Sequence, residues 1–362
     1  MRNDTRLNAS RSARHLWLSA SAAALTAVAA AAGIAAGPGN AAPGRYAAKA
    51  SYAHKADRFK HPKLQHGVLT IEGTDAGDRI ALRLAAGDSG VLQVDVGDDG
   101  TADFSVARAE IGAIVVNGGD GDDLVRIDDR NGAVNAGTPT TIRGGDGDDT
   151  LAGGSGNETL RGGDGNDAVD GNGGTDVGLL GDGDDTFVWD PGDGSDVVEG
   201  QDGHDTMLFN GAGGAEQFDL SANGHRLRFF RTQGAITMDT QGVERVDVNA
   251  LGGADTVTVN DLRGTDVSAV NVDLAGALGG ATGDGQPDRV VVNGTDRDDR
   301  IDVSGDASEV KVSGLAATTR ILHSEVANDR LEVNTLAGTD SVESVGLDAG
   351  AIQLFVDGVL VP

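Results

Sequence analysis

The sequence GGDGDDTLA at residues 144–152 recurs, with variation, every nine residues as far as Leu208. The following units are GGSGNETLR (153–161), GGDGNDAVD (162–170), GNGGTDVGL (171–179), LGDGDDTFV (180–188), PGDGSDVVE (191–199) and GQDGHDTML (200–208). Two residues, Trp189 and Asp190, interrupt the count. A fixed period of this kind indicates a repeat architecture in which each unit stacks on its neighbours.

Each unit predicts a six-residue glycine-rich loop followed by a three-residue strand. Glycine permits positive φ and close backbone approach, so the loop carbonyl groups can point inward. Two units make one turn, and loops from alternate units stack along one edge. Position eight of each unit is expected to face the core, which gives the stack Leu151, Leu160, Val169, Phe187, Val198 and Met207. We therefore predict an all-β fold, a parallel β-roll (β-solenoid) of nonapeptide repeats flanked by related β-strand modules.

Position six carries an acid in every unit, and an earlier unit, Gly118–Arg126, carries one as well. The candidate metal ligands are Asp123, Asp149, Glu158, Asp167, Asp176, Asp185, Asp196 and Asp205. Stacking of alternate units places Asp149 over Asp167, Glu158 over Asp176, Asp167 over Asp185, Asp176 over Asp196, and Asp185 over Asp205. The sequence thus predicts columns of carboxylates along the edges of the roll.

Stacked carboxylates roughly 5 Å apart repel by ~0.8 kcal/mol in bulk water and by ~3 kcal/mol at an effective dielectric constant near 20. A hard divalent cation that accepts carboxylate and carbonyl oxygens reverses the sign of this interaction, and calcium tolerates irregular geometry better than magnesium does. We therefore expect several Ca²⁺ ions as the cofactor, and we expect folding to be coupled to their binding.

The array resembles the repeats-in-toxin, or haemolysin-type calcium-binding, nonapeptide family, most strongly at Gly144–Ala152 and Gly162–Asp170. The resemblance implies a parallel β-roll that binds calcium in its loops and is largely disordered without it. It assigns the ligand role at position six to Asp149, Asp167, Asp185, Asp196 and Asp205. The departures from the family pattern are Glu158 for aspartate, Gly178 for the core aliphatic residue, and Leu180 and Pro191 for the first glycine.

Alternating apolar residues and glycine-rich turns predict three looser β modules around the array. Strands are expected at 91–96, up to 106, and at 218–220, 227–230, 243–248, 309–313, 319–322 and 330–334. The predicted division is a signal peptide (1–41), a basic disordered linker (42–66), an N-terminal β module (67–143), the calcium-binding β-roll (144–208), a middle β module (209–289) and a C-terminal β module (290–362). Asp255 and Asp299 lie in degenerate copies, where a turn-forming role is favoured over a ligand role.

Composition supports this interpretation and excludes several classes of protein. The chain has 362 residues, 57 glycines, no cysteine and a formal charge of −29, with 47 Asp against 10 Glu. Aspartate favours turns and glutamate favours helices, so the excess of aspartate argues against a mostly helical fold. Strong negative charge argues against nucleic acid as a partner. Without cysteine, disulfides and thiolate metal sites are excluded.

Arginine residues precede an uncharged, alanine-rich stretch from Leu16 to Ala36, which predicts a signal peptide cleaved near Ala41 and therefore a secreted, extracellular protein. A retained membrane anchor is the alternative, because the uncharged run is about long enough to span a bilayer. After cleavage we expect no stable membrane insertion. The linker holds four of the five lysines. It is expected to be solvated, or else to bind an anionic cell-envelope polymer.

No catalytic motif is present: the chain lacks HExxH, GxSxG and a Walker-type lysine loop. We therefore expect a secreted calcium-binding protein with a structural or adhesive role and no enzymatic activity. The alternative is a calcium-stabilised extracellular carbohydrate-active enzyme, either a lyase or a hydrolase, whose scattered acids would escape a motif search. Few aromatic residues are available for a sugar platform, since the chain has 2 Trp, 2 Tyr and 8 Phe.

Overall fold

The computed structural model describes residues 59–362, which fold as β-strands and three one-turn 3-10 helices. The strands form one sheet of 15 strands, here called the first sheet, and one of 14 strands, the second sheet. The all-β fold class is therefore confirmed, and most strand pairs are parallel, as in a β-roll. The predicted signal peptide and residues 42–58 of the predicted linker lie outside the described residues.

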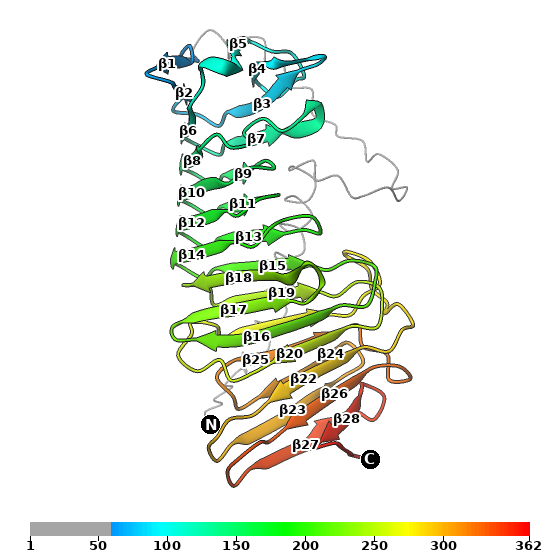
Figure 1. The fold of residues 1–362 in the computed structure, drawn as a ribbon. Helices are drawn as coiled ribbons and strands as arrows, with labels where there is room; N and C mark the ends of the chain where they lie inside the picture. Colours follow the sequence, from blue (N-terminus) through cyan, green and yellow to red (C-terminus); the bar gives the residue numbers. More distant parts are fainter. Residues whose placement is uncertain (1–58) are drawn as a thin grey trace, which may run out of the picture. The chain divides into compact units, whose positions relative to one another are not determined.

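The array forms coils that each give one strand to each sheet (Figure 1). In the first sheet these strands are β8 (Thr140–Asp146), β10 (Glu158–Asp164), β12 (Val177–Asp182) and β14 (Val197–Asp202). In the second sheet they are β9 (Thr150–Ala152), β11 (Ala168–Asp170), β13 (Thr186–Trp189) and β15 (Thr206–Asn210). Leu160 pairs with Gly178 and Val169 with Phe187, so two nonapeptides make one turn, as predicted.

Strands before the array continue the same two sheets. They are β1 (Lys63–Gln65), β2 (Val68–Glu72), β3 (Arg79–Ala85), β4 (Asp88–Val96), β5 (Phe104–Ala107), β6 (Ala113–Asp120) and β7 (Leu124–Asp128). The 3-10 helices η1 (Arg108–Glu110) and η2 (Asp129–Asn131) follow β5 and β7. The unit at Gly118–Arg126 spans parts of β6 and β7, so the roll begins before Gly144.

The predicted boundary between linker and fold at residue 66 lies inside the fold. Strand β1 pairs antiparallel with β2, with Leu64 opposite Leu69, and Phe59 is buried. Lys60 is exposed, so the basic composition of this segment coexists with an apolar inner face. The sequence analysis assigned these residues to a disordered linker because the lysines dominate the local charge.

Strands after the array extend both sheets to the C-terminus. They are β16 (Gln217–Asn223), β17 (Arg226–Arg231), β18 (Ile236–Gln241), β19 (Arg245–Asn249), β20 (Thr256–Val259), β21 (Ala269–Asp273), β22 (Arg289–Asn293), β23 (Arg300–Asp306), β24 (Glu309–Ser313), β25 (Thr318–Leu322), β26 (Arg330–Asn334), β27 (Ser341–Leu347), β28 (Gln353–Val356) and β29 (Val359–Leu360). The third 3-10 helix, η3 (Gln233–Ala235), precedes β18. Within residues 59–362 no helix has the length and apolar character needed to cross a membrane.

The two sheets contain three antiparallel three-strand meanders: β3–β5 at one edge of the second sheet, β23–β25 within that sheet, and β16–β18 within the first. The outer strands of the meander β16–β18 pair parallel with the coils on either side, since β18 joins β14 and β16 joins β20. The first sheet therefore continues through the meander β16–β18 without a break.

The core lies between the two sheets and contains the predicted stack at position eight. Its six predicted members are fully buried: Leu151, Leu160, Val169, Phe187, Val198 and Met207. Gly178 occupies position eight of its unit, and a Cβ there would lie 2.9 Å from two ring carbons of Phe187. The departure at Gly178 is therefore explained by the larger ring that fills its space.

Candidate metal centre

An acid stands immediately before, or at the first residue of, each array strand from β9 to β15, at the end of a glycine-rich loop. Loops that lead into the second sheet carry Asp149, Asp167, Asp185 and Asp205, and loops that lead into the first sheet carry Glu158, Asp176 and Asp196. Because alternate loops belong to the same sheet, these acids form two separate columns, one on each edge of the roll.

In the column beside the second sheet, the backbone N–H of each acid donates to the Oδ1 atom of the next one along. The N···O distances are 2.8 Å from Asp149 to Asp167, 2.7 Å from Asp167 to Asp185, and 3.0 Å from Asp185 to Asp205. The column continues at both ends. Asp123 N–H donates to Asp149, and Asp205 N–H donates to Glu244, at 2.7 and 2.8 Å.

The column beside the first sheet follows the same rule. Glu158 N–H donates to Asp176 Oδ1 at 2.7 Å, and Asp176 N–H donates to Asp196 Oδ1 at 2.8 Å. Together the two columns contain all five vertical pairs that the sequence predicts. The insertion at 189–190 lengthens the coil, so the pair Asp176–Asp196 is 20 residues apart, whereas Glu158–Asp176 is 18 apart.

The sequence-predicted acids are buried, and in five of them one carboxylate oxygen lacks a partner within the described part of the chain. Asp149, Asp167, Asp176, Asp185 and Asp205 are each at most 3% exposed. Their Oδ2 atoms are buried and make no hydrogen bond. A buried carboxylate oxygen without a partner is costly, because burial removes its water and nothing replaces it.

Burial raises the pKa of these carboxyl groups, and repulsion from neighbouring acids adds to the effect. The pKa is raised to about 7 for Asp149, Asp167, Asp185 and Asp205, and to about 9 for Asp176. For Glu158 it is raised to about 7, and for Asp196, through burial, to about 6. Each ladder therefore resists carrying its full negative charge without a counter-ion.

Where the first position of a unit is glycine, as at Gly144 and Gly162, the carboxylate of the same unit lies against it. A Cβ on Gly162 would lie 2.1 Å from Asp167 Oδ2 and 2.2 Å from the Leu180 carbonyl oxygen. The second glycine, Gly163, has φ of +134°, and a Cβ there would lie 2.0 Å from the Gly145 carbonyl oxygen. The glycine pattern thus packs successive loops closely and brings carbonyl and carboxylate oxygens together.

The donor set fits a hard divalent cation. Carboxylate and carbonyl oxygens are the ligands that calcium takes in proteins. No group of three or more His, Cys, Asp or Glu side chains gathers in metal-binding geometry among residues 59–362. A cation in these loops would therefore combine one or two ladder carboxylates with backbone carbonyl groups.

The ladders include acids that the sequence analysis did not propose as ligands. They are Asp78 and Glu244 beside the second sheet, and Glu216, Asp255, Asp288 and Asp329 beside the first. Asp299 and Asp340 form a further pair, at 2.8 Å. An acid directly preceding a short apolar strand is the sequence signal shared by most of these positions, for example at Asp78 and Asp255.

The pair Asp255–Asp288 repeats the features of the array. Glu216 N–H donates to Asp255 Oδ1 at 2.7 Å, and Asp255 N–H donates to Asp288 Oδ1 at 2.8 Å. Burial, followed by repulsion from neighbouring acids, raises the pKa of Asp255 to about 7 and that of Asp288 to about 8. The turn-forming role favoured for Asp255 by the sequence therefore describes only part of its environment.

Comparison with known proteins gives little beyond this geometry. No family model matches the chain, and no curated protein matches it. Among solved structures, the chain is similar to an extracellular lipase, LipA, from Serratia marcescens, with 12% sequence identity and a TM-score of 0.19. The match covers 60% of this chain and 43% of the lipase chain. The assignment of a parallel β-roll consequently rests on the strands and acid ladders themselves.

Proposed function

We propose that the chain is an exported calcium-binding protein of the repeats-in-toxin type, with a structural or adhesive role. The observation that carries the proposal is the column of stacked, buried carboxylates, most of which have an oxygen that lacks a hydrogen-bond partner in residues 59–362. Asp149, Asp167 and Asp185 illustrate it, because they follow one another directly in the ladder and the Oδ2 atom of each is buried without a hydrogen bond.

Calcium suits these loops better than other common ions. The ligand atoms are hard oxygens, which excludes a preference for soft metals. Magnesium demands near-ideal octahedral geometry, whereas calcium accepts six to eight oxygens in irregular arrangements. The ligands in this proposal are the array acids Asp123, Asp149, Glu158, Asp167, Asp176, Asp185, Asp196 and Asp205, together with loop carbonyl groups.

Binding and folding are coupled in this proposal. Without a cation, each vertical pair of carboxylates repels by ~3 kcal/mol at an effective dielectric constant near 20, and the repulsion recurs along both columns. With a cation, the same oxygens are attracted to a shared charge, so the binding free energy contributes directly to folding. Calcium binding outside the cell would then drive folding of the roll.

Export is proposed from the predicted signal peptide at residues 1–41, together with the absence of cysteine. In this proposal the basic residues of segment 42–66 contact an anionic cell-envelope polymer. Deletion of residues 42–58, which leaves strand β1 intact, tests the contact by measuring retention on the cell envelope. Unchanged retention would refute it.

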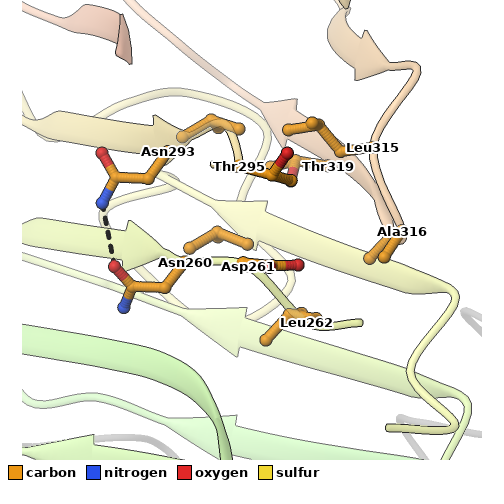
Figure 2. A pocket seen from close by; sticks show the side chains of 11 residues that line it. Asn260, Asp261, Leu262, Asn293, Thr295, Leu315, Ala316 and Thr319 are labelled. Atoms are coloured by element: carbon orange, nitrogen blue, oxygen red, sulfur yellow. Dashed lines mark hydrogen bonds between the residues drawn. The ribbon is translucent and has the colours of Figure 1, made fainter. Parts of the chain in front are cut away.

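The proposal assigns no catalytic role. Trp189 is fully buried and therefore cannot serve as a sugar platform. The cavity beside Asn260, Asp261 and Asn293 has a volume of about 10 Å³, enough for about one water molecule (Figure 2). Incubating the calcium-loaded protein with a panel of polysaccharides tests the alternative of a carbohydrate-active enzyme; new reducing ends or unsaturated products would favour that alternative.

A calcium titration followed by far-UV circular dichroism tests the proposed function. We expect a gain of β signal with a midpoint in the ~10⁻⁴–10⁻³ M range of extracellular modules, and a much smaller response to magnesium. Asp185→Asn should weaken the response, because it removes a ladder carboxylate. Asp182→Asn is the matched control, since Asp182 belongs to the same unit and is exposed. A spectrum that is already β-rich in chelator and unaffected by calcium would contradict the proposal.

A further inference from the structure

Eleven of the ladder acids fall into two kinds according to one backbone hydrogen bond. In the first kind, here called closed rungs, the N–H of the residue four positions earlier donates to the carboxylate. The donors and acceptors are Thr74 to Asp78, Gly154 to Glu158, Ala212 to Glu216, Thr295 to Asp299, and Glu325 to Asp329, with distances between 2.5 and 2.7 Å. In a closed rung the loop itself satisfies the second oxygen of the acid.

In the second kind, here called open rungs, that hydrogen bond is absent and the oxygen is buried without a partner among residues 59–362. The open rungs are Asp149, Asp167, Asp176, Asp185, Asp205 and Asp255. Five of these six acids belong to the nonapeptide array. Asp255 is the exception, because it lies beyond the array, between strands β19 and β20.

The conformation of the residue four positions before the acid separates the two kinds. In every open rung this residue has positive φ: Gly145, Gly163, Asn172, Gly181, Gln201 and Leu251, with φ of 133°, 134°, 55°, 128°, 82° and 66°. None of the corresponding residues of the closed rungs has positive φ. A change in the sign of φ reorients the adjacent peptide groups, so the N–H no longer reaches the carboxylate.

Leu251, the residue four positions before Asp255, has an unusual backbone conformation. A leucine with φ of 66° is uncommon, because the left-handed region is sterically unfavourable for a residue with a Cβ. Asp255 is 1% exposed, and its Oδ1 atom already accepts the Glu216 N–H. The loop thus holds a strained residue in the conformation that leaves Asp255 Oδ2 without a hydrogen bond.

The surroundings of Asp255 are negative. Glu216 precedes it in the ladder and Asp288 follows it. Asp284, in the segment between β21 and β22, contacts the loop of Asp255, because its carboxylate accepts the Gly253 N–H at 2.6 Å. Arg231, the basic side chain beside Glu216, is engaged by the Glu216 carboxylate through its Nε and Nη2 atoms. A buried carboxylate oxygen therefore lies among further acids, and the neighbouring guanidinium is already paired.

We propose that Asp255 forms a divalent-cation site outside the nonapeptide array, and that the closed rungs outside the array, Asp78, Glu216, Asp299 and Asp329, do not take a cation. The inference rests on the proposed function, because the same cation would occupy the open rungs of the array. Calcium is the expected ion, since a carboxylate oxygen is a hard ligand of the kind that calcium takes in proteins. The site adds one ion to those held by the array and places it between the array and the C-terminal strands.

Counting the calcium ions bound to the full chain tests the proposal, by equilibrium dialysis with elemental analysis at saturating calcium. Asp255→Asn should lose one bound ion, because asparagine keeps the acceptor for the Glu216 N–H but removes the charge. Asp299→Asn is the matched control at a closed rung and should keep the full number. The proposal is overturned if Asp255→Asn keeps the full number, or if Asp299→Asn loses an ion as well.

Two further measurements keep the outcomes distinguishable. Asp167→Asn, at an open rung of the array, should also lose bound calcium; if it does and Asp255→Asn does not, the proposed function stands and only the Asp255 site fails. Should Asp255→Asn not fold, hydrogen exchange of the wild-type loop 250–255 decides. Calcium should slow exchange there at least tenfold, and an unchanged rate would refute the site.

Discussion

At the scale of single residues, a glycine at the first position of a unit allows the backbone to lie against the carboxylate of the same unit. Gly162 lies against both the carboxylate of Asp167 and the carbonyl oxygen of Leu180. A methyl group at this position would push away the two kinds of oxygen that a calcium ion needs. The same contact recurs at Gly144, where a Cβ would lie 2.0 Å from Asp149 Oδ2.

Gly162→Ala is therefore expected to destabilise the calcium-loaded fold by about 1–3 kcal/mol, the range for overpacking a rigid site. Denaturant unfolding at saturating calcium measures this change. Gly213→Ala provides the control, because a Cβ on Gly213 would have no neighbouring atom within 4 Å, and Gly213 does not have positive φ. The control should change stability by less than about 0.5 kcal/mol. Equal losses in the two variants would contradict the explanation.

Residue positions in the array could be predicted because a fixed period sets the spacing between vertical neighbours. Asp149 and Asp167 are 18 residues apart, and that distance can be read directly from the sequence. Asp255 has no such guide. Its vertical neighbour Glu216 lies 39 residues earlier, since the meander β16–β18 intervenes. The hydrogen bond from the Gly154 N–H to Glu158 could not be predicted either, because Gly153 and Gly154 match the glycine pattern of the other units.

At the scale of elements, the two-residue insertion after the fifth unit contributes to the packing between the array and the meander β16–β18. Trp189, at the end of β13, stacks on Phe209 in β15 with ring centroids 4.0 Å apart. Phe209 in turn lies 4.4 Å from Phe229 in β17, and the Arg231 guanidinium lies 5.3 Å from the Trp189 ring. The insertion thus gives the last coils an aromatic core shared with the meander β16–β18.

Trp189 should report the folding of these coils. In a Trp17→Phe chain, Trp189 is the single tryptophan. Calcium is expected to shift its emission to shorter wavelength, because the fold buries the ring completely. The shift should follow the same calcium dependence as the gain in β signal. If the emission is already at short wavelength in chelator and calcium does not change it, the end of the array folds without the ion.

The strands themselves were largely predictable, and their partners were only partly so. Alternation of apolar residues located β24 and β26, which the structure places at Glu309–Ser313 and Arg330–Asn334. The sequence did not indicate that β16 would pair with β20 while β18 pairs with β14. Apolar periodicity identifies the buried face of a strand, but strand order depends on packing between distant segments.

At the scale of the whole molecule, the charge of −29 sets how the fold responds to pH. The ladder carboxyl groups Asp149, Asp167 and Asp185 have pKa values raised from 3.8 to about 7, and Asp176 has one raised to about 9. Burial is the main cause of these raised pKa values, and repulsion from neighbouring acids raises them further. Between about pH 4 and pH 7 the cation-free folded chain therefore binds more protons than the unfolded chain does.

Because the folded state binds the additional protons, the stability of the cation-free fold must fall as pH rises through this range. We therefore expect the chain in chelator to gain β signal when the pH is lowered from about 8 to about 5.5, since protons replace calcium in neutralising the ladders. The apparent calcium affinity should fall over the same interval, because protons compete for the same oxygens. Circular dichroism at each pH, with and without calcium, measures both effects. A cation-free fold that loses β signal on mild acidification would show that the ladder carboxylates are not the groups that oppose folding.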